Sequence, residues 1–183
     1  MAIAINYYGS IADADSYFAN RLHSGAWLQA DPADQPKALW AASVIIDTLN
    51  YKGIKHALWA LDKEFAYPPN FYAPRKFPTP EAIHAANLSQ PLEFPRDSDT
   101  VVPSDIEQAC YEIAFSLLDG RDPELELESL GITQMAYGQV QSSYNRNQPP
   151  IEHLVNGIPN ALAWRLIRPY LASSDEIRLT RVS

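Results

Sequence analysis

The chain has 183 residues, a net charge of −8 and a single cysteine. This length suffices for one domain whose core needs no disulfide, and no apolar run approaches the roughly 18 residues of a membrane span. Tight nucleic-acid binding is disfavoured because it requires clustered Lys and Arg, which are absent. We expect a soluble intracellular protein, or part of something assembled inside a cell. Its negative charge is concentrated in residues 1–144, since residues 145–183 carry five arginines against three carboxylates.

The N-terminal segment predicts an arm and then a short helix. Residues 2–9 (AIAINYYG) suit either a strand or an arm that lies on a neighbour. Ser10 and Asp13 are spaced to cap a helix of about three turns, which ends before Gly25. Its inward face holds Ala14, Tyr17, Phe18 and Leu22.

The next helix begins near Pro32 or Pro36, because proline is tolerated in a first helical turn. Its apolar positions recur at i, i+3, i+4, i+7, i+8 and i+11, which is the cleanest helical pattern in the chain. These positions are Ala38, Ala41, Ala42, Ile45, Ile46 and Leu49.

Residues 54–100 are rich in proline and aromatic residues, with seven of the fifteen prolines between Pro68 and Pro95. Proline disrupts regular helix and sheet, so we expect a helix only around residues 79–88. The aromatic rings favour packing along a surface over disorder. The interpretation is an ordered excursion.

Residues 102–130 contain the helix around which the chain is organised. Ser104 and Glu107 fit a capping box, and Gly120 supplies the stop of a helix of roughly 14 residues, about 21 Å long. Its apolar stripe holds Ile106, Cys110, Ile113 and Leu117. Cys110 on this stripe is more consistent with a small buried hydrophobe than with a nucleophile.

An acidic segment follows this helix, and we expect it to be a loop. Its carboxylates are Asp122, Glu124, Glu126 and Glu128. Acid–base catalysis needs two carboxyls in different environments. A solvated face therefore explains this polar stretch better than a catalytic pair.

The C-terminal third predicts a hairpin, a helix and an exposed strand. Residues 132–145 alternate beyond Gly138, which we place near the tip of the hairpin. The last helix opens at residues 157–159 and must end or kink at Pro169. Its inward residues are Leu162, Ala163, Leu166 and Ile167. The final EIRLTRV alternates like an exposed strand that another chain could pair with.

The predicted fold is mainly α. It is a small four-helix bundle with a β-hairpin-like excursion, a Pro- and aromatic-rich insertion at 54–89 and extended terminal arms, the C-terminal one at 172–183. All of this lies in one domain, 1–183. The predicted bundle core is Tyr17, Phe18, Ile45, Ile46, Leu49, Ile106, Cys110, Ile113, Leu117, Leu162 and Leu166.

Catalytic signatures are missing from the sequence. The four histidines, His23, His56, His84 and His153, lack metal-ligand spacing, and no phosphate-binding loop or nucleophile elbow occurs. The four tryptophans fit core or interface packing better than base stacking, because Lys and Arg are not interleaved with them. We expect no enzyme, no metal and no cofactor.

Six segments, in order, resemble the head-to-tail adaptor (connector) proteins of tailed bacteriophages, a family also labelled DnaT-like single-stranded-DNA-binding domain. They are DADSYFANRL (13–22), LNYKG (49–53), QPLEFPRD (90–97), VPSDIEQACYEIAFSLLDGRDPELELESL (102–130), YGQVQSSYNR (137–146) and GIPNALAWRLIRPYL (157–171). Residues 54–89 depart from the pattern as an insertion. This insertion could contact partners at a ring's periphery or brace its own subunit.

The resemblance implies a virion protein, assembled in the host cytoplasm, that forms a ring of twelve subunits. Such a ring binds the portal protein on one face, the next neck or tail protein on the other, and lets double-stranded DNA pass. We expect Asp122, Glu124, Glu126 and Glu128 to line the channel, where like charge repels DNA, or else an outer solvated face. Portal or neighbour contacts are expected at Ile177, Arg178, Leu179, Thr180, Arg181 and Val182. The rival interpretation is a single-stranded-DNA-binding replication accessory protein, which the charge distribution disfavours.

Overall fold

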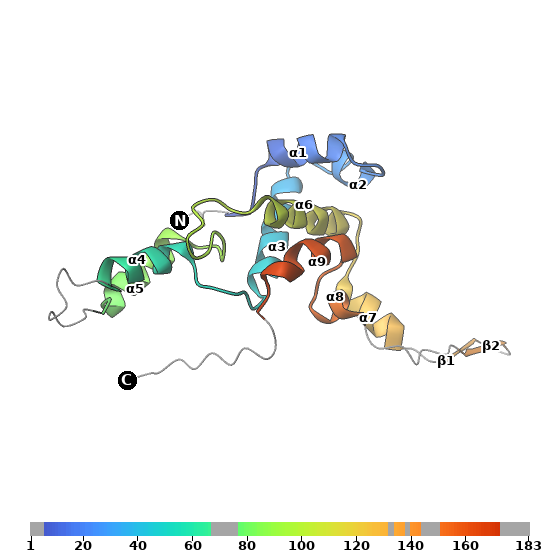
Figure 1. Ribbon diagram of the computed structural model, residues 1–183. Coiled ribbons are helices and arrows are strands. Elements are labelled where there is room, and N and C mark those ends of the chain that lie inside the picture. The colour runs from blue at the N-terminus through green and yellow to red at the C-terminus, as the bar shows by residue number, and fades with distance from the viewer. Residues whose placement is uncertain (1–5, 67–76, 132–133, 138–139, 144–150, 173–183) are drawn as a thin grey trace.

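The computed structural model describes residues 6–66, 77–131, 134–137, 140–143 and 151–172, and it is mainly helical, as the sequence predicted (Figure 1). The helices are α1 (Ile11–Ala19), α2 (Gly25–Leu28), α3 (Gln35–Asp47), α4 (His56–Ala66), α5 (Pro80–Ser89), α6 (Ser104–Leu118), α7 (Pro123–Gly131), α8 (Glu152–Val155) and α9 (Ala161–Ile167). A 3-10 turn, η1 (Arg168–Tyr170), follows α9, and the strands β1 (Gln134–Tyr137) and β2 (Val140–Ser143) pair antiparallel.

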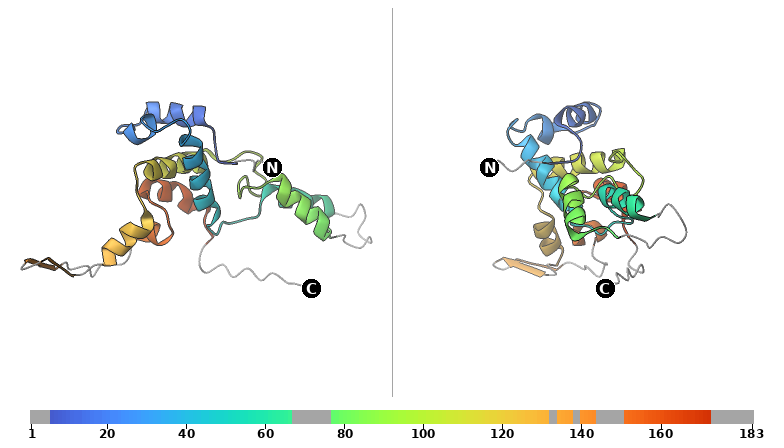
Figure 2. Two further views of the ribbon diagram at one scale, coloured as in Figure 1. Left: turned by 180° about the vertical axis from the view of Figure 1, so that it is seen from behind. Right: turned by 90° about the vertical axis from the view of Figure 1, so that its left-hand side faces the viewer.

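Helix α6 forms the centre of the body. Helices α3 and α9 make their most extensive contacts with it, and α1 and α2 cover it from a third direction (Figures 1 and 2). Of the predicted core, Phe18, Ile46, Ile106, Cys110 and Ile113 are fully buried. Tyr17, Ile45, Leu49, Leu117 and Leu166 pack against them while partly buried. The central position predicted for this helix is therefore confirmed.

Helix α1 begins where the sequence placed it. The Ser10 hydroxyl accepts a hydrogen bond from the Asp13 N–H at 3.1 Å, which satisfies one of the free N–H groups of the first turn. The helix ends at Ala19, however, so Leu22 lies beyond it and is 84% exposed. Placing Leu22 on the buried face was wrong, because the helical period no longer applies after residue 19.

Helix α3 has Pro36 in its first turn and buries Ala38, Ala42 and Ile46, as predicted. It also buries Leu39 and Ser43, which widens the stripe toward α6. The unpredicted helix α2 places Trp27 in the core, where its indole N–H donates to Asp15 at 2.8 Å.

The capping box predicted at the start of α6 is not formed. Pro103 is the residue before the helix, and its carbonyl accepts from the N–H groups of Ile106 and Glu107. Ser104 is already the first helical residue, one position too far along for its hydroxyl to cap. The helix is 15 residues long and continues to Leu118.

The excursion after residue 54 contains a helix that the sequence analysis missed. Helix α4 occupies residues before Pro68, where no proline interrupts the chain. Helix α5 is capped by the Thr79 hydroxyl, in agreement with the helix predicted at 79–88. The two helices pack on each other and extend away from the body as a pair (Figure 1).

The acidic segment is also helical, which corrects the predicted loop. Pro123 opens α7, and the Asp122 carboxylate accepts from the Glu124 N–H at 2.9 Å. Proline and aspartate are both favourable at a helix start, so the same residues that suggested a loop form a helix terminus.

Helix α9 is capped by Asn160, whose side chain accepts from the Leu162 N–H at 2.8 Å. Ala163 and Ile167 are buried as predicted, whereas Leu162 is 43% exposed and its placement in the core was wrong. Trp164 is buried in its place, because the helix is rotated relative to the predicted face. The α-helix ends at Ile167, two residues before Pro169, and continues as η1.

Candidate functional site

A buried carboxylate of α6 is bonded to α1, to the turn that follows α1 and to the start of α9. The Glu112 carboxylate, fully buried, accepts two hydrogen bonds from the Arg21 guanidinium, at 2.7 and 2.9 Å. It also accepts from the Tyr17 hydroxyl at 2.8 Å and the Asn160 amide at 2.9 Å. The guanidinium carbon lies 4.2 Å from the centre of the Phe115 ring. Each oxygen of the Glu112 carboxylate accepts two hydrogen bonds. The carboxylate therefore holds the helices together and has no lone pair left to act as a general base.

Sequence reasoning missed Glu112, although a signal was present. Ala109, Glu112 and Ser116 are spaced i, i+3 and i+7 on one buried face of α6. A carboxylate in line with small apolar residues must be paired, because an isolated buried charge is very costly. The pattern requires a cation from another element but does not say which.

A second buried group ties the N-terminal segment to α3. The Tyr8 hydroxyl donates to the Asp47 carboxylate and accepts from the Phe94 N–H at 3.2 Å. The same carboxylate accepts from the Glu93 N–H at 3.3 Å. Burial raises the pKa of Asp47 above its ordinary value, and burial together with the Asp47 charge raises the pKa of Tyr8. Tyr8 is buried and Asp47 is half-buried, and the hydrogen bonds of both groups hold the N-terminal segment and residues 93–94 against α3.

Arg96 fastens the base of the α4–α5 pair to the body. Its guanidinium donates to the carbonyls of Lys52 at 2.8 Å and Gly53 at 2.7 Å, and it pairs with the Glu93 carboxylate. Asp97 accepts from the Ile54 N–H at 2.9 Å and donates its own N–H to the Ile54 carbonyl. These bonds hold the segment that leads into α4 beside the segment that follows α5.

The groups that could perform chemistry are closed off or dispersed in the part of the chain that the structure describes. Burial raises the pKa of the Cys110 thiol to about 12, so it is not a nucleophile at neutral pH. Within those residues no three His, Cys, Asp or Glu side chains gather where they could hold a metal ion. None of the described helices is long and apolar enough to cross a membrane.

Two hollows on the surface are lined by both polar and apolar side chains. The larger, about 410 Å³, lies between the N-terminal segment at Asn6 and Tyr7 and the turn at residues 89–92. The smaller, about 250 Å³, is lined by Lys52, Arg96, Asp97 and Asp99. The Arg96 guanidinium there is already bonded to carbonyls and to Glu93, so it has little left to offer a ligand.

The four acidic residues expected to line a channel are only partly brought together. Glu124 and Glu128 are exposed one helical turn apart on α7, with the exposed Leu125 beside them. Glu126 is half-buried, and Asp122 is exposed but occupied in capping the helix. The predicted contact residues Ile177 to Val182 lie outside the described residues. In comparisons with known proteins, no family model, no curated protein and no solved structure matches the chain.

The remaining candidate surfaces are apolar and exposed. Helix α5 has no buried residue at all, and its Ile83 and Leu88 are exposed on the projecting pair. On the body, Trp40 and Val44 of α3 and Leu162 of α9 are exposed by more than two fifths. These exposed apolar side chains lie on three different helices, α3, α5 and α9.

Proposed function

We propose that the protein is a structural ring adaptor of a tailed-bacteriophage virion, which joins the portal at the capsid vertex to the neck or tail and leaves a channel for DNA. Its subunit is a small four-helix bundle of α1, α3, α6 and α9, with the β1–β2 hairpin, the α4–α5 pair and the terminal arms as contact elements. Twelve copies of the 20.5 kDa chain would weigh about 246 kDa. The sequence resemblance supplies the identity of the assembly.

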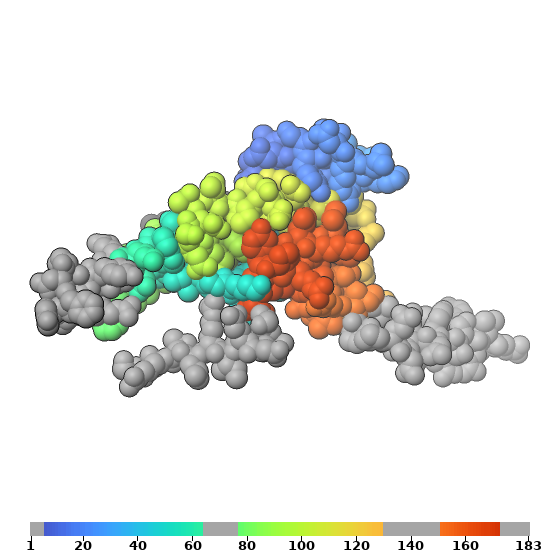
Figure 3. All heavy atoms as spheres, in the orientation of Figure 1, coloured from blue at the N-terminus to red at the C-terminus, as the bar shows by residue number. Residues whose placement is uncertain are grey.

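The observation that carries the proposal is the projecting α4–α5 pair. Two helices that contact mainly each other bury little apolar surface, and tertiary packing is what normally stabilises short helices. Ile83 and Leu88 remain exposed on the outside of α5. The pair does not lie over the core (Figure 3), which weighs against a brace and favours contacts with another protein at the ring's periphery.

The acidic surface fits the proposed channel. Glu124 and Glu128 present two carboxylates in the same direction on α7, and a negative wall repels DNA phosphate so that the genome slides past it. Asp122 and Glu126 add charge to the same helix. This role and the docking of Ile177 to Val182 on the portal or a neighbour as an added strand are parts of the proposal.

The test is the mass of the purified protein with and without its portal, measured by light scattering. A ring that forms alone, or a monomer that becomes a ring on the portal, supports the adaptor. A monomer that ignores the portal and binds single-stranded oligonucleotides at low salt overturns it in favour of the replication accessory function.

A variant sharpens this test. Replacing residues 56–89 with a short Gly-Ser linker should leave a folded body, because Lys55 and Gln90 lie where the chain enters and leaves the pair. If the pair contacts a partner, particles built with this variant join heads to tails poorly. Deleting residues 174–183 tests the C-terminal arm in the same assay. Normal joining by either variant removes that contact from the proposal.

A further inference from the structure

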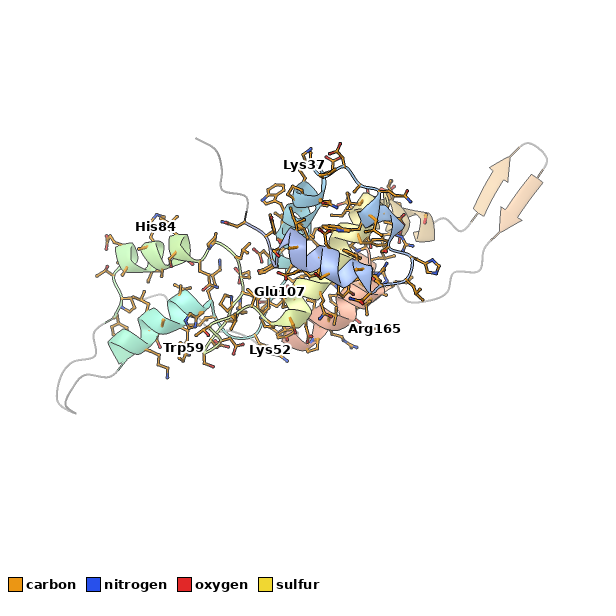
Figure 4. The ribbon with its side chains drawn as sticks, turned by 90° about the horizontal axis from the view of Figure 1, so that it is seen from above. Lys37, Lys52, Trp59, His84, Glu107 and Arg165 are labelled. Carbon is orange, nitrogen blue, oxygen red and sulfur yellow. The ribbon has the colours of Figure 1, made fainter. Side chains whose placement is uncertain are left out.

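The outer faces of α3 and α9 point in opposite directions. Both helices pack on α6, and neither makes a substantial contact with the other. Seen from above, Lys37 of α3 and Arg165 of α9 lie on opposite sides of the body (Figure 4). One molecule therefore has two separate helix faces that it cannot bring together itself.

The outer face of α3 is apolar at its centre. Lys37, Trp40 and Val44 are spaced three and four residues apart and line one stripe of the helix. Trp40 is 47% exposed and Val44 is 45% exposed. Trp40 has about half of its surface exposed in the middle of a helix face, and tryptophan is among the side chains most enriched at the centre of protein interfaces.

The outer face of α9 has a similar apolar centre and a positive rim. Leu162 is 43% exposed, and Arg165 follows it one turn later on the same face. Arg165 and Arg168 are exposed and form no ion pair with the residues that the structure describes. In a protein of net charge −8, this is a local excess of positive charge.

The charges at the edges of the two faces are complementary. Asp31 and Asp34 are exposed at the N-terminal end of α3, and Lys37, whose ammonium lies 2.7 Å from the Asp34 carboxylate, opposes them. The α3 face thus has a net charge of −1, with its apolar centre one turn away. A second copy that presents Leu162 with Arg165 and Arg168 would match both the apolar centre and the charge.

We infer that the outer face of α9 in one copy packs on the outer face of α3 in the next, and that this contact builds the ring. The inference rests on the ring proposed above and names its surfaces. Because the two faces differ and point apart, each copy can bind one neighbour on each side. Such head-to-tail contacts close into rings when the rotation between copies allows it.

Two substitutions test the contact, one on each face. Trp40→Lys removes the apolar centre of α3 and places a cation opposite Arg165, and Leu162→Asp removes the centre of α9 and places an anion opposite Asp31 and Asp34. Both sites are exposed, so each variant should fold. Leu22→Asp is the matched control, because Leu22 is also an exposed leucine but lies on neither the α3 face nor the α9 face.

Each variant alone should be a monomer by light scattering, while the control keeps the wild-type mass. An equimolar mixture of the two variants should form a dimer and nothing larger. The intact α9 face of the Trp40→Lys copy binds the intact α3 face of the Leu162→Asp copy. The other two faces carry the substitutions, so no third copy can bind. Variants that assemble like the wild type overturn the contact while leaving the ring itself intact.

A cross-linking measurement covers association too weak for light scattering. Cys110, the one native cysteine, is buried, so introduced thiols dominate the reaction. A Val44→Cys, Leu162→Cys double variant should form a ladder of disulfide-linked species under oxidation, and each single variant should remain monomeric. No ladder overturns the contact without bearing on portal binding, whereas dimers of a single variant show that like faces meet.

Discussion

At the scale of single residues, the stability of the body depends on the buried carboxylate of Glu112. It is fully buried and depends on Arg21, which is one quarter exposed, for its counter-charge. Removing one partner of a buried pair commonly costs about 3–5 kcal/mol, because the other charge remains unpaired. Tyr17 and Asn160 donate to the same carboxylate, so Glu112 also holds α1 and the start of α9 against α6.

We predict that Arg21→Ala lowers the free energy of unfolding by about 3 kcal/mol in urea titrations. Adding Glu112→Gln to this variant should restore part of the loss, because the unpaired charge is then gone. The amide oxygen can still accept from Asn160, and the amide NH2 can donate to the Tyr17 hydroxyl. Lys37→Ala is the control, since its ion pair with Asp34 is exposed and should matter little. If the double variant is no more stable than Arg21→Ala, the unpaired Glu112 charge is not what destabilises Arg21→Ala.

Asp47 makes a prediction about pH. Its folded pKa is raised by burial, and the charges facing it are Glu93, which raises the pKa, and Lys55, which lowers it. A raised carboxyl pKa means that the folded state favours the protonated form, so this stability is present at low pH and is lost as pH rises through the folded pKa.

Asp47→Asn should therefore gain stability relative to the wild type as pH rises from about 4 toward neutrality. The asparagine oxygen still accepts from Tyr8 and from the Glu93 N–H, so the contacts are largely kept. Urea unfolding of both proteins at several pH values measures the difference. A difference that stays constant over this range would contradict the raised pKa.

At the scale of elements, the junction between the body and the α4–α5 pair depends on Gly53. Its φ is +71°, and a Cβ there would lie 1.8 Å from the Asp97 carboxylate. That carboxylate holds the Ile54 N–H, so a side chain at position 53 displaces the group that keeps the two connecting segments together.

Gly53→Ala should destabilise the protein by about 1 kcal/mol more than Gly120→Ala, by denaturant titration. Gly120 is the matched control, because its φ is +76° and nothing lies within 4 Å of its Cβ position. Both variants incur the left-handed strain, and only Gly53→Ala also meets Asp97. Equal losses for the two would mean that Asp97 moves aside at no cost.

Local sequence patterns predicted elements better than they predicted faces and contacts. The cap at Ser10, the proline start of α3 and the helix around residues 79–88 are confirmed, since each depends on residues close together in the sequence. Leu162 was misplaced because its helix turns Trp164 inward, which only the neighbouring helix decides. The prediction missed α4 because it applied the proline content from Pro68 onward to all of residues 54–100, although α4 ends before Pro68.

The ion pair of Arg21 and Glu112 shows why the rest could not be predicted. The two residues are 91 positions apart, and nothing local to either names the other. The same limit applies to Arg96. Its partners Lys52 and Gly53 precede α4 in the sequence, whereas Arg96 follows α5. Such contacts follow from how the helices pack and not from the pattern within any one of them.

At the scale of the whole molecule, the distribution of charge makes the final prediction. If α7 borders the DNA channel, replacing both Glu124 and Glu128 with Lys converts repulsion of the DNA phosphates into attraction. Rings should still form, because these residues lie on neither the α3 nor the α9 face, but DNA should leave the particles more slowly. The rate of DNA release from purified particles measures this.

The effect should shrink as salt is raised, since ions screen exposed charges beyond about 10 Å at 0.1 M. Asp62→Lys with Glu81→Lys makes the same change in charge on the α4–α5 pair and should leave the rate unchanged. Release at the wild-type rate by the α7 variant would place that helix on an outer surface of the ring.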